Sequence, residues 1–342
     1  NEQKDLDTLY TNSDGGAGCA ASRARFAAVA ATLPAAAVPT YYAFGCPTFA
    51  DPIYNDLVSS QSIDESEWSG TAKLAYRFTP DVMSYLSYAR GYKASGYNLD
   101  RERTPIVPPA GSPPGPPLFI ADTDTSFRPE IVDSFELGTK TTLFGRSLLL
   151  NTALFYQEFQ DFQLNTFTGI SFVVVSIPEV TSRGVDLDLT WAPPVEDLTV
   201  NAGLTYAETE YGDFTPPFAA LFRLPNSQMS FAPKWSASLS TTYERAIGGS
   251  LLWRANVGAK YTSEYNTGSD LNPAKLQDAL TLVNARIGIG AQNRRWMLEA
   301  WAQNLTDEEY YQVVFDATLQ TGTLNGYLGA PRTYGLTLRM TF

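Results

Sequence analysis

The end of the chain alternates strictly between apolar and polar positions. Every second residue from Tyr334 to Phe342 is apolar or aromatic, and the residues between them are small or polar. The same alternation recurs in residues 185–191, 235–243 and 251–261. Because successive side chains of a β-strand point to opposite faces, a period of two predicts strands with one apolar and one polar face.

Eleven segments follow this pattern closely enough to be predicted as strands. They cover approximately residues 67–78, 82–93, 131–144, 147–162, 180–191, 198–209, 233–245, 250–262, 278–290, 294–303 and 332–342. Their length, about ten residues or more, is what a tilted strand needs to cross the hydrocarbon core of a membrane. Strands of soluble sheets are usually about five or six residues long. The segment lengths therefore favour a transmembrane β-barrel over a soluble sandwich.

The connections between these strands alternate in length. Short turns are expected at residues 79–81, 145–146, 192–197, 246–249 and 291–293. Long loops are expected at residues 94–130, 163–179, 210–232, 263–277 and 304–331. This alternation is typical of an outer-membrane barrel, which has short periplasmic turns and long extracellular loops.

The two faces of the strands differ in chemistry. The apolar face is expected to meet lipid through Leu187, Leu189, Leu239, Val257, Ile287, Leu298, Leu336 and Leu338. The polar face is expected to line the lumen with Asp186, Asp188, Arg254, Lys260, Arg286, Glu299 and Arg339. Aromatic residues gather at strand ends, including Tyr76, Phe78, Trp191, Tyr243, Trp253, Trp296 and Phe342. Together with the strand lengths, they indicate the aromatic girdles of a barrel, although β-propensity alone also favours aromatic residues in strands.

An odd number of strands cannot close into an antiparallel barrel. The first and last predicted strands both run from the long-loop end to the short-turn end, so pairing them would be parallel. Bacterial single-chain barrels are antiparallel with even strand numbers, and an unpaired edge in lipid is costly. The sequence therefore predicts an all-β chain in which residues 66–342 form part of a larger transmembrane antiparallel β-barrel.

Residues 1–65 precede the predicted strands and are expected to form an extracellular loop region. A strand hidden in residues 26–44 is the alternative, but Pro34 and Pro39 disfavour it. The two cysteines of the chain, Cys19 and Cys46, both lie in this region. Such a pair fits a disulfide in an oxidising compartment, and two unpaired thiols are the alternative.

Composition narrows the possible functions. The formal net charge is −12, and there is no histidine. The acidic balance argues against a nucleic-acid partner, because phosphate binding needs an excess of Lys and Arg. Without His the commonest general base and metal ligand is missing, so we expect no enzyme, no metal site and no cofactor. Asp270, with Asn266 and Asn272, offers oxygen ligands for Ca²⁺, and solvated turn residues are the alternative.

Five motifs point to a known family. They are YLSYARGYKASGYN (85–98), RPEIVDSFELGTKT (128–141), VTSRGVDLDL (180–189), WAQNLTDEEYY (301–311) and GAPRTYGLTLRMTF (329–342). In order and spacing they resemble the C-terminal half of TonB-dependent outer-membrane receptors. The resemblance covers about residues 66–342. It implies about eleven strands of a barrel of roughly 22 strands, with no plug domain in this chain.

The resemblance also implies partners and a function. The partners are outer-membrane lipid, an N-terminal half of the barrel with its plug, TonB with ExbB and ExbD acting through that plug, and a small-molecule ligand. The implied function is active uptake of a scarce nutrient, such as a ferric siderophore, across the bacterial outer membrane. A passive porin-like channel and a structural outer-membrane protein, each assembled with a partner chain, are the alternatives. A plug in the full gene would distinguish the receptor from both.

Ligand contacts are expected from the loops and the upper lumen. The candidates are Arg90, Tyr92, Tyr97, Asn98, Arg128, Tyr211, Phe214, Phe222, Arg223, Tyr265 and Tyr327. Arginines combined with aromatic rings would suit anionic aromatic chelates, whereas aromatic rings alone would suit sugars. Packing within its own loop is the alternative role of each of these residues.

Overall fold

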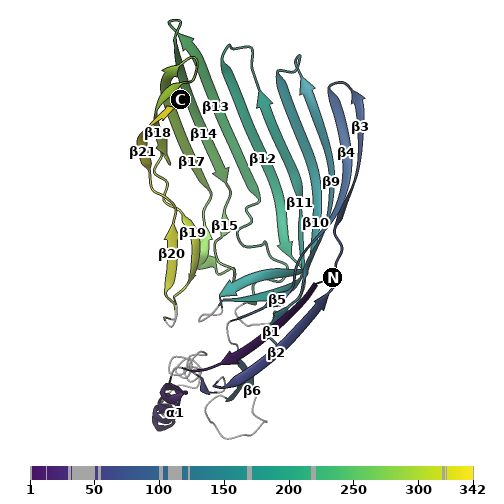
Figure 1. Ribbon diagram of the computed structural model, residues 1–342, viewed down its shortest axis with the longest axis vertical. Coiled ribbons are helices and arrows are strands. Elements are labelled where there is room, and N and C mark those ends of the chain that lie inside the picture. Colours follow the sequence, from purple (N-terminus) through teal and green to yellow (C-terminus); the bar gives the residue numbers. More distant parts are fainter. Residues whose placement is uncertain are drawn as a thin grey trace.

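One large antiparallel sheet dominates the molecule (Figure 1). The computed structural model describes the chain except for residues 1, 13, 30–31, 33–50, 53–54, 100–102, 107–117, 122–123, 168–171, 217–220, 318–319, 321 and 342. In spatial order the strands of the sheet are β21 (Thr333–Met340), β18 (Trp296–Gln303), β17 (Leu280–Ala291), β14 (Leu251–Thr262), β13 (Trp235–Ile247), β12 (Leu198–Tyr211), β11 (Phe172–Trp191), β10 (Leu148–Phe167), β9 (Glu130–Leu143), β4 (Val82–Lys93) and β3 (Gly70–Thr79). The eleven strands predicted from the alternation are confirmed.

The large sheet has two unpaired edges within the described part of the chain. β3 pairs only with β4, and β21 pairs only with β18. We call the end that carries the long loops the outer end and the opposite end the turn end. Both edge strands run from the outer end to the turn end, so the expectation that these residues do not close a barrel by themselves is confirmed.

Smaller elements are gathered at the outer end (Figure 1). Five two-stranded sheets are found among the described residues. They are β1 (Glu2–Tyr10) with β2 (Leu57–Glu65), β5 (Gly96–Tyr97) with β8 (Ser126–Phe127), β6 (Arg103–Ile106) with β7 (Leu118–Ala121), β15 (Tyr265–Asn266) with β16 (Leu276–Gln277), and β19 (Tyr311–Asp316) with β20 (Leu324–Leu328). In the described part of residues 1–65, no strand joins the large sheet. Most of residues 26–44, where a hidden strand was the alternative, lie outside the described residues.

Helix α1 (Ala17–Val29) lies in the region that was expected to be a loop. Its sequence, AGCAASRARFAAV, is rich in alanine, the best helix former. The Asp14 carboxylate accepts hydrogen bonds from the backbone N–H groups of Gly18 at 2.8 Å and Gly16 at 2.9 Å. These bonds lower the pKa of Asp14 and satisfy helix N–H groups that have no partner within the helix.

Cys19 is buried on helix α1. Its predicted partner, Cys46, lies outside the described residues, so the disulfide stays a prediction. Among the described residues, no helix is both long enough and apolar enough to cross a membrane.

The register of the large sheet confirms the predicted apolar face. Directly opposed residues share a face, and the pairs include Leu187 with Leu204 and Leu298 with Leu338. The apolar side chains of this face are largely open to the surroundings: Val257 is 53% and Leu336 is 74% exposed. Apolar side chains exposed at this density suit lipid rather than water as the surrounding solvent.

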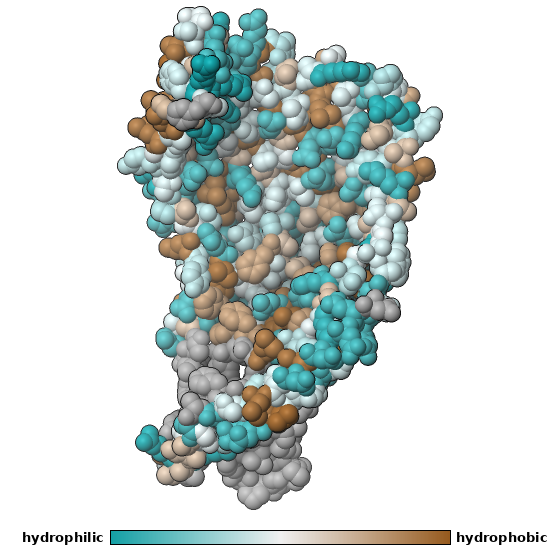
Figure 2. Space-filling view, viewed as in Figure 1, coloured by the Kyte–Doolittle hydropathy of each residue, from teal (hydrophilic) through white to brown (hydrophobic). Residues whose placement is uncertain are grey.

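The opposite face of the sheet is polar, and its charges meet one another. Glu299 lies 3.5 Å from Arg286 and 3.9 Å from Arg339. Tyr85 donates a 2.5 Å hydrogen bond to Glu136. A groove on this face is lined by Asn151, Asp188, Asn201, Gly203, Ser238, Ser240, Gly258, Lys260 and Asn284, among others. In the view of Figure 2, hydrophilic and intermediate atoms cover much of the sheet, and hydrophobic atoms appear at its side borders and in smaller patches between them.

The prediction of a loop at residues 163–179 is wrong. β10 and β11 are twenty residues long each and continue as a hairpin past the predicted strand end. Pairing skips Asp161 and Pro178, which lie opposite each other, because Pro178 has no N–H to donate and Asp161 adopts a positive φ of 51°. Beyond this break, the hairpin reaches across the outer end toward β19 and β20 (Figure 1).

Candidate functional site

The outer part of the β10–β11 hairpin is held in place by a small apolar core. Its fully buried members are Leu164, Ile177, Val180, Tyr211, Leu221 and Leu224. They come from the hairpin, from the end of β12 and from the loop that follows β12. Burying such side chains stabilises each by about 1.5–3 kcal/mol, so the hairpin is fixed rather than trailing in solvent.

Polar contacts fix the same hairpin on its other side. The Asn98 side chain donates to the Val174 carbonyl at 2.9 Å and accepts from the Val174 N–H at 2.7 Å. The Gln163 amide donates to the carbonyls of Ala94 at 2.9 Å and Arg128 at 3.0 Å. These side chains satisfy backbone groups that have no strand partner, as buried backbone polar groups require.

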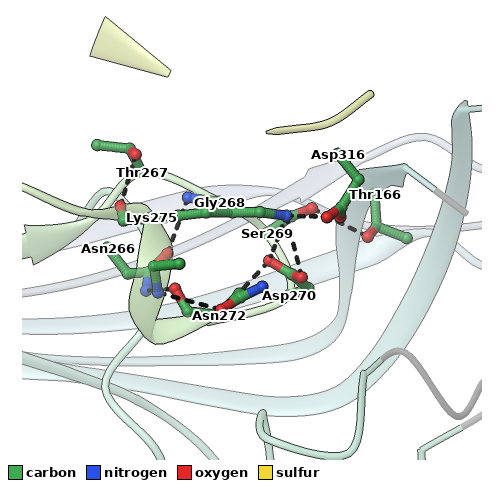
Figure 3. Close-up of polar contacts among 10 residues, drawn as sticks. Thr166, Asn266, Thr267, Gly268, Ser269, Asp270, Asn272, Lys275 and Asp316 are labelled. Atoms are coloured by element: carbon green, nitrogen blue, oxygen red, sulfur yellow. Dashed lines mark hydrogen bonds and ion pairs between the residues drawn. The ribbon is translucent and has the colours of Figure 1, made fainter. Parts of the chain in front are cut away.

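A buried lysine gathers polar contacts at the outer end (Figure 3). Lys275 is 3% exposed, and its Nζ lies 3.0 Å from both carboxylate oxygens of Asp270 and 2.7 Å from one of Asp316. It ends a 3-10 helix (Pro273–Lys275), whose N-cap, Asn272, accepts a hydrogen bond from the Ala274 N–H. A buried charge is tolerated only when it is paired and hydrogen-bonded, and both carboxylates serve that purpose here. We call these three residues the Lys275 network.

Three segments that are far apart in sequence meet around the Lys275 network. Asp316 belongs to β19, and the Val314 N–H of the same strand donates to the Thr267 carbonyl at 3.2 Å. The hydroxyls of Thr166, on β10, and Ser269 are 2.9 Å apart. The β10–β11 hairpin, the loop of residues 267–275 and the β19–β20 hairpin are therefore connected as one layer.

The Ca²⁺ site considered at Asp270, Asn266 and Asn272 is not what the structure shows. The ammonium group of Lys275 occupies the cation position beside the Asp270 carboxylate. Asn266 instead donates to the Asn272 carbonyl at 2.8 Å and accepts from the Gly268 N–H at 2.9 Å. No cluster of three or more metal-ligating His, Cys, Asp or Glu residues occurs in the described part of the chain.

Four aromatic rings run from the tip of the β10–β11 hairpin to the β19–β20 hairpin. The ring centroids of Phe172 and Phe167 are 4.9 Å apart, those of Phe167 and Phe315 6.1 Å, and those of Phe315 and Tyr327 5.8 Å. The two end members are open to solvent, with Phe172 56% and Tyr327 60% exposed. We call these four residues the aromatic row. Its open ring faces can stack on a flat or sugar-like ligand group.

The three arginines that were predicted to contact a ligand all interact with other residues of the protein. Arg90 lies 2.6 Å from Asp133, and its guanidinium stands 5.2 Å from the Trp68 ring centre. Arg128 approaches Asp161 to 3.4 Å and remains largely exposed. Arg223 stacks over the Phe222 ring at 4.2 Å.

Arg90 lies on the apolar side of the sheet. Its pairing with Asp133 places it in the same alternation as the exposed Leu86 and Leu137, on the apolar side of the sheet. The upper lumen, for which it was a candidate, is on the other side. Contact of Arg90 with a ligand stays a prediction.

The other predicted residues divide between packing and exposure. Tyr211 is 2% exposed in the apolar core and Phe214 packs against that core, so Tyr211 offers no surface to a ligand in this conformation. Tyr97 donates to the Lys4 carbonyl at 2.9 Å, and burial raises the pKa of the half-buried Tyr265. Open surface remains at Tyr92, Phe222 and Tyr327. Ligand contact by these residues stays a prediction.

The sequence reasoning missed Phe167, Phe172, Phe315 and the Lys275 network. Residues 162–165 alternate between Phe or Leu and polar residues, and residues 173–175 are a run of three valines. That pattern could have extended the two neighbouring strands. The contact of Lys275 with Asp316 has no local signal, since 41 residues separate them.

The fold is similar to several solved structures. The ferric yersiniabactin uptake receptor FyuA from Yersinia pestis is 20% identical, with a TM-score of 0.66 over 84% of this chain and 39% of that one. The ferric-catecholate import receptor Fiu from E. coli K12 is 20% identical, with a TM-score of 0.57 over 84% and 36%. The copper transporter OprC is 15% identical, with a TM-score of 0.58 over 87% and 41%. The chain thus spans roughly two fifths of each of these proteins.

The family model of the TonB dependent receptor-like β-barrel matches residues 46–305. That range contains ten of the eleven strands of the large sheet, from β3 to β18, and leaves out only β21. It also contains three of the two-stranded sheets of the outer end: β5 with β8, β6 with β7, and β15 with β16. With the motifs, the sheet and the match in agreement, the chain belongs to the family of TonB-dependent receptor β-barrels.

Proposed function

We propose that this chain forms part of the wall and outer mouth of a receptor that imports a scarce nutrient across the bacterial outer membrane. The observation that carries the proposal is the family match over residues 46–305. A transport receptor also accounts for a polar inner face and an apolar outer face on one sheet. Enzymatic chemistry has no part in this proposal.

The ligand we favour is a ferric siderophore. Two of the similar structures are named as ferric yersiniabactin and ferric-catecholate receptors, and a third as a copper transporter. The aromatic row is the feature of this chain that supports the choice, because its exposed rings could stack on the flat aromatic groups of a chelate. Arg128, largely exposed near the hairpin, would attract an anionic chelate.

The two unpaired edges define what the rest of the barrel must provide. Both β3 and β21 run from the outer end to the turn end, so their partners must run the opposite way. An odd number of additional strands satisfies this condition at both edges. A second copy of this chain in the same orientation does not, because β21 of one copy would then run parallel to β3 of the next. We therefore favour an N-terminal barrel half, with a plug through which TonB, ExbB and ExbD act.

Within this scheme, residues 1–65 serve as an extracellular region and residues 66–342 as barrel wall with its loops. The β1–β2 sheet supports this division, because it docks on the outer end: Lys4 donates to the Ser95 carbonyl at 2.6 Å, and Gln61 accepts from the Thr125 N–H at 2.8 Å.

Uptake by the full gene product tests the proposal. Cells that express the gene with its upstream reading frame would be supplied with radiolabelled ferric catecholate, ferric phenolate and ferric hydroxamate chelates. We expect uptake of one class, and its loss in a matched strain without TonB. Diffusive entry of unrelated small solutes, unchanged without TonB, would instead support the porin-like alternative. No transport of either kind would favour the structural alternative.

A further inference from the structure

A charged cluster lies on the apolar side of the sheet, away from the lumen and the mouth. Arg183 donates to one oxygen of Glu208 through Nη2 at 2.8 Å and Nε at 3.1 Å. The Nζ of Lys234 lies 3.7 Å from the other Glu208 oxygen. Two cations therefore share one carboxylate, and the side chain of Arg183 is 63% exposed. We call Arg183, Glu208 and Lys234 the outward cluster.

The register shows that Arg183 and Glu208 point outward. They are directly opposed, and the next outward pair along these strands is Val185 with Tyr206. Val185 is 40% exposed on the apolar face. The neighbouring pair on the outer side of Arg183 and Glu208, Ser182 with Thr209, faces inward, and its two hydroxyls are hydrogen-bonded at 2.8 Å.

The position along the strand places the cluster at the outer border of the apolar band. β11 ends at Trp191, next to the short turn, and residues 183–191 make up nine positions. About nine to eleven residues are what a tilted strand needs to span hydrocarbon. The rings of Tyr206 and Trp235, 4.7 Å apart, lie beside the cluster as interfacial aromatic residues do.

The chemistry of the cluster matches a lipid headgroup. Arg and Lys side chains donate charge-assisted hydrogen bonds to phosphate, and Arg does so with a planar, two-pronged geometry. Glu208, and Glu210 on the same face one pair farther out, can accept from hydroxyl or amide donors. Val185 and the 41% exposed Leu204 extend an apolar track toward the turn end, where acyl chains would lie.

We propose that the outward cluster binds the phosphate-bearing headgroup of a glycolipid in the outer leaflet. The phosphate would sit against Arg183 and Lys234, sugar hydroxyls would face the two carboxylates, and acyl chains would pack on Val185 and Leu204. The inference rests on the membrane placement in the proposed function, but it does not depend on which nutrient is imported.

Lipid titration of the full-length receptor in detergent tests this inference. The probes are a diphosphorylated, acylated glucosamine disaccharide, its dephosphorylated form and inorganic phosphate, with bound lipid counted by native mass spectrometry. The test protein carries Arg183→Gln and Lys234→Gln together, and the single Lys234→Gln protein serves if the double variant folds poorly. The control is Arg146→Gln, because Arg146 is also an exposed arginine beside a carboxylate, Asp81, but at the turn end.

We expect the phosphorylated lipid to bind the double variant at least about tenfold more weakly than wild type, since each removed donor loses a charge-assisted hydrogen bond. The Lys234→Gln protein should lose a smaller factor, and the control should bind as wild type does. Equal binding by wild type and both cluster variants would overturn the inference and would leave the cluster as a cross-strand ion pair.

Two further outcomes would also overturn it: equal binding of the dephosphorylated lipid, or displacement of the lipid by millimolar phosphate, which would indicate a site for a soluble anion. The proposed function fails in a distinguishable way. Wild-type protein that does not insert into lipid vesicles would refute the membrane placement itself, whereas insertion with unaltered lipid binding by the variants refutes only the headgroup site.

Discussion

The large sheet and the outer layer, by which we mean the hairpins and loops of the outer end, bury their side chains in different ways, although β10 and β11 run through both. Between residues 148 and 160, β10 has no fully buried side chain, and Leu154 is 52% exposed. Beyond Asp161 the same strand contributes Leu164 to a closed apolar core, and β11 contributes Ile177 at 0% exposure. Among the described residues, most fully buried apolar side chains lie in the outer layer. A sheet wall in lipid needs no core of its own, whereas loops in water do.

The two regions are held rigid by different interactions. In the sheet, continuous backbone hydrogen bonds between neighbouring strands hold the wall together. In the outer layer, the ladders are short, and side chains such as Lys275, Asn98 and Gln163 carry the connections. Substitutions in the two regions should therefore fail by different mechanisms.

The largest effect is expected from Lys275→Met. It leaves Asp270 and the half-exposed Asp316 without their cation, and breaking a buried pair from one side costs roughly 3–5 kcal/mol. Hydrogen exchange should accelerate in residues 263–277 and 311–328 and stay unchanged in β13 and β14. Arg146→Gln, at an exposed pair, is the control and should change neither region. Loosening of the whole sheet by Lys275→Met would show that the two regions are one cooperative unit.

The second-largest effect is expected from placing a charge on the apolar face. Val257→Arg places a cation in the lipid-facing middle of β14, at a cost of about 2–4 kcal/mol. The free energy of unfolding in lipid vesicles would be measured in urea. Ser238→Arg, on the polar face beside Asp188 and Lys260, is the matched control and should cost much less. Equal costs at the two positions would reverse the assignment of the faces.

Asn98→Ala should loosen the hairpin by a smaller amount. The Val174 N–H and carbonyl would lose their partners, which costs about 1–3 kcal/mol when the groups stay buried. Limited proteolysis should then cut residues 163–179 faster. Asn201→Ala, whose amide accepts a bond from an exposed Thr190 hydroxyl, should not change the rate. Unchanged cutting of the Asn98 variant would mean that the apolar core alone holds the hairpin.

Ligand affinity should respond modestly to the aromatic row. Phe172→Ala and Tyr327→Ala each remove one exposed ring, worth about 0.5–1.5 kcal/mol in a stacked contact. Under the proposed function, binding of a ferric chelate by the full-length receptor should weaken by a few-fold in each variant. Tyr76→Ala, which removes an exposed ring of an aromatic pair at the turn end, should leave affinity unchanged. If the control weakens binding as much as the two variants do, the row is not the contact.

The smallest effect is expected in the stability of helix α1 at low pH. Hydrogen bonds from Gly18 and Gly16 lower the pKa of Asp14 below its ordinary value of 3.8. A lowered pKa means that the stabilisation is present above about that value and is lost as pH falls through the folded-state pKa. Protection factors of α1 should therefore drop in strong acid while those of the sheet hold. Asp14→Asn, which keeps an uncharged cap, should flatten the response, and an unchanged profile would assign it to other groups.

The sequence by itself was enough to predict the large sheet. Alternation in residues 251–261 and 334–342 is a local property, and a strand with one face in lipid and one in the lumen needs no other information to show it. The eleven strands, their faces and the unpaired edges of β3 and β21 all follow from that period and from the loop lengths. The family resemblance rests on motifs in the same strands.

Only the tertiary structure decided the outer layer. Residues 163–179 were expected to be a loop. In the structure, the two strands pair again beyond the break at Asp161 and Pro178, and Leu221 and Leu224 cover the extended hairpin. Lys275 could be read as a loop charge until Asp316, from a strand 41 residues away, was brought within 2.7 Å. In water, the structure of a loop depends on which distant side chains cover it and pair with it. The local periodicity of the sequence does not predict those contacts.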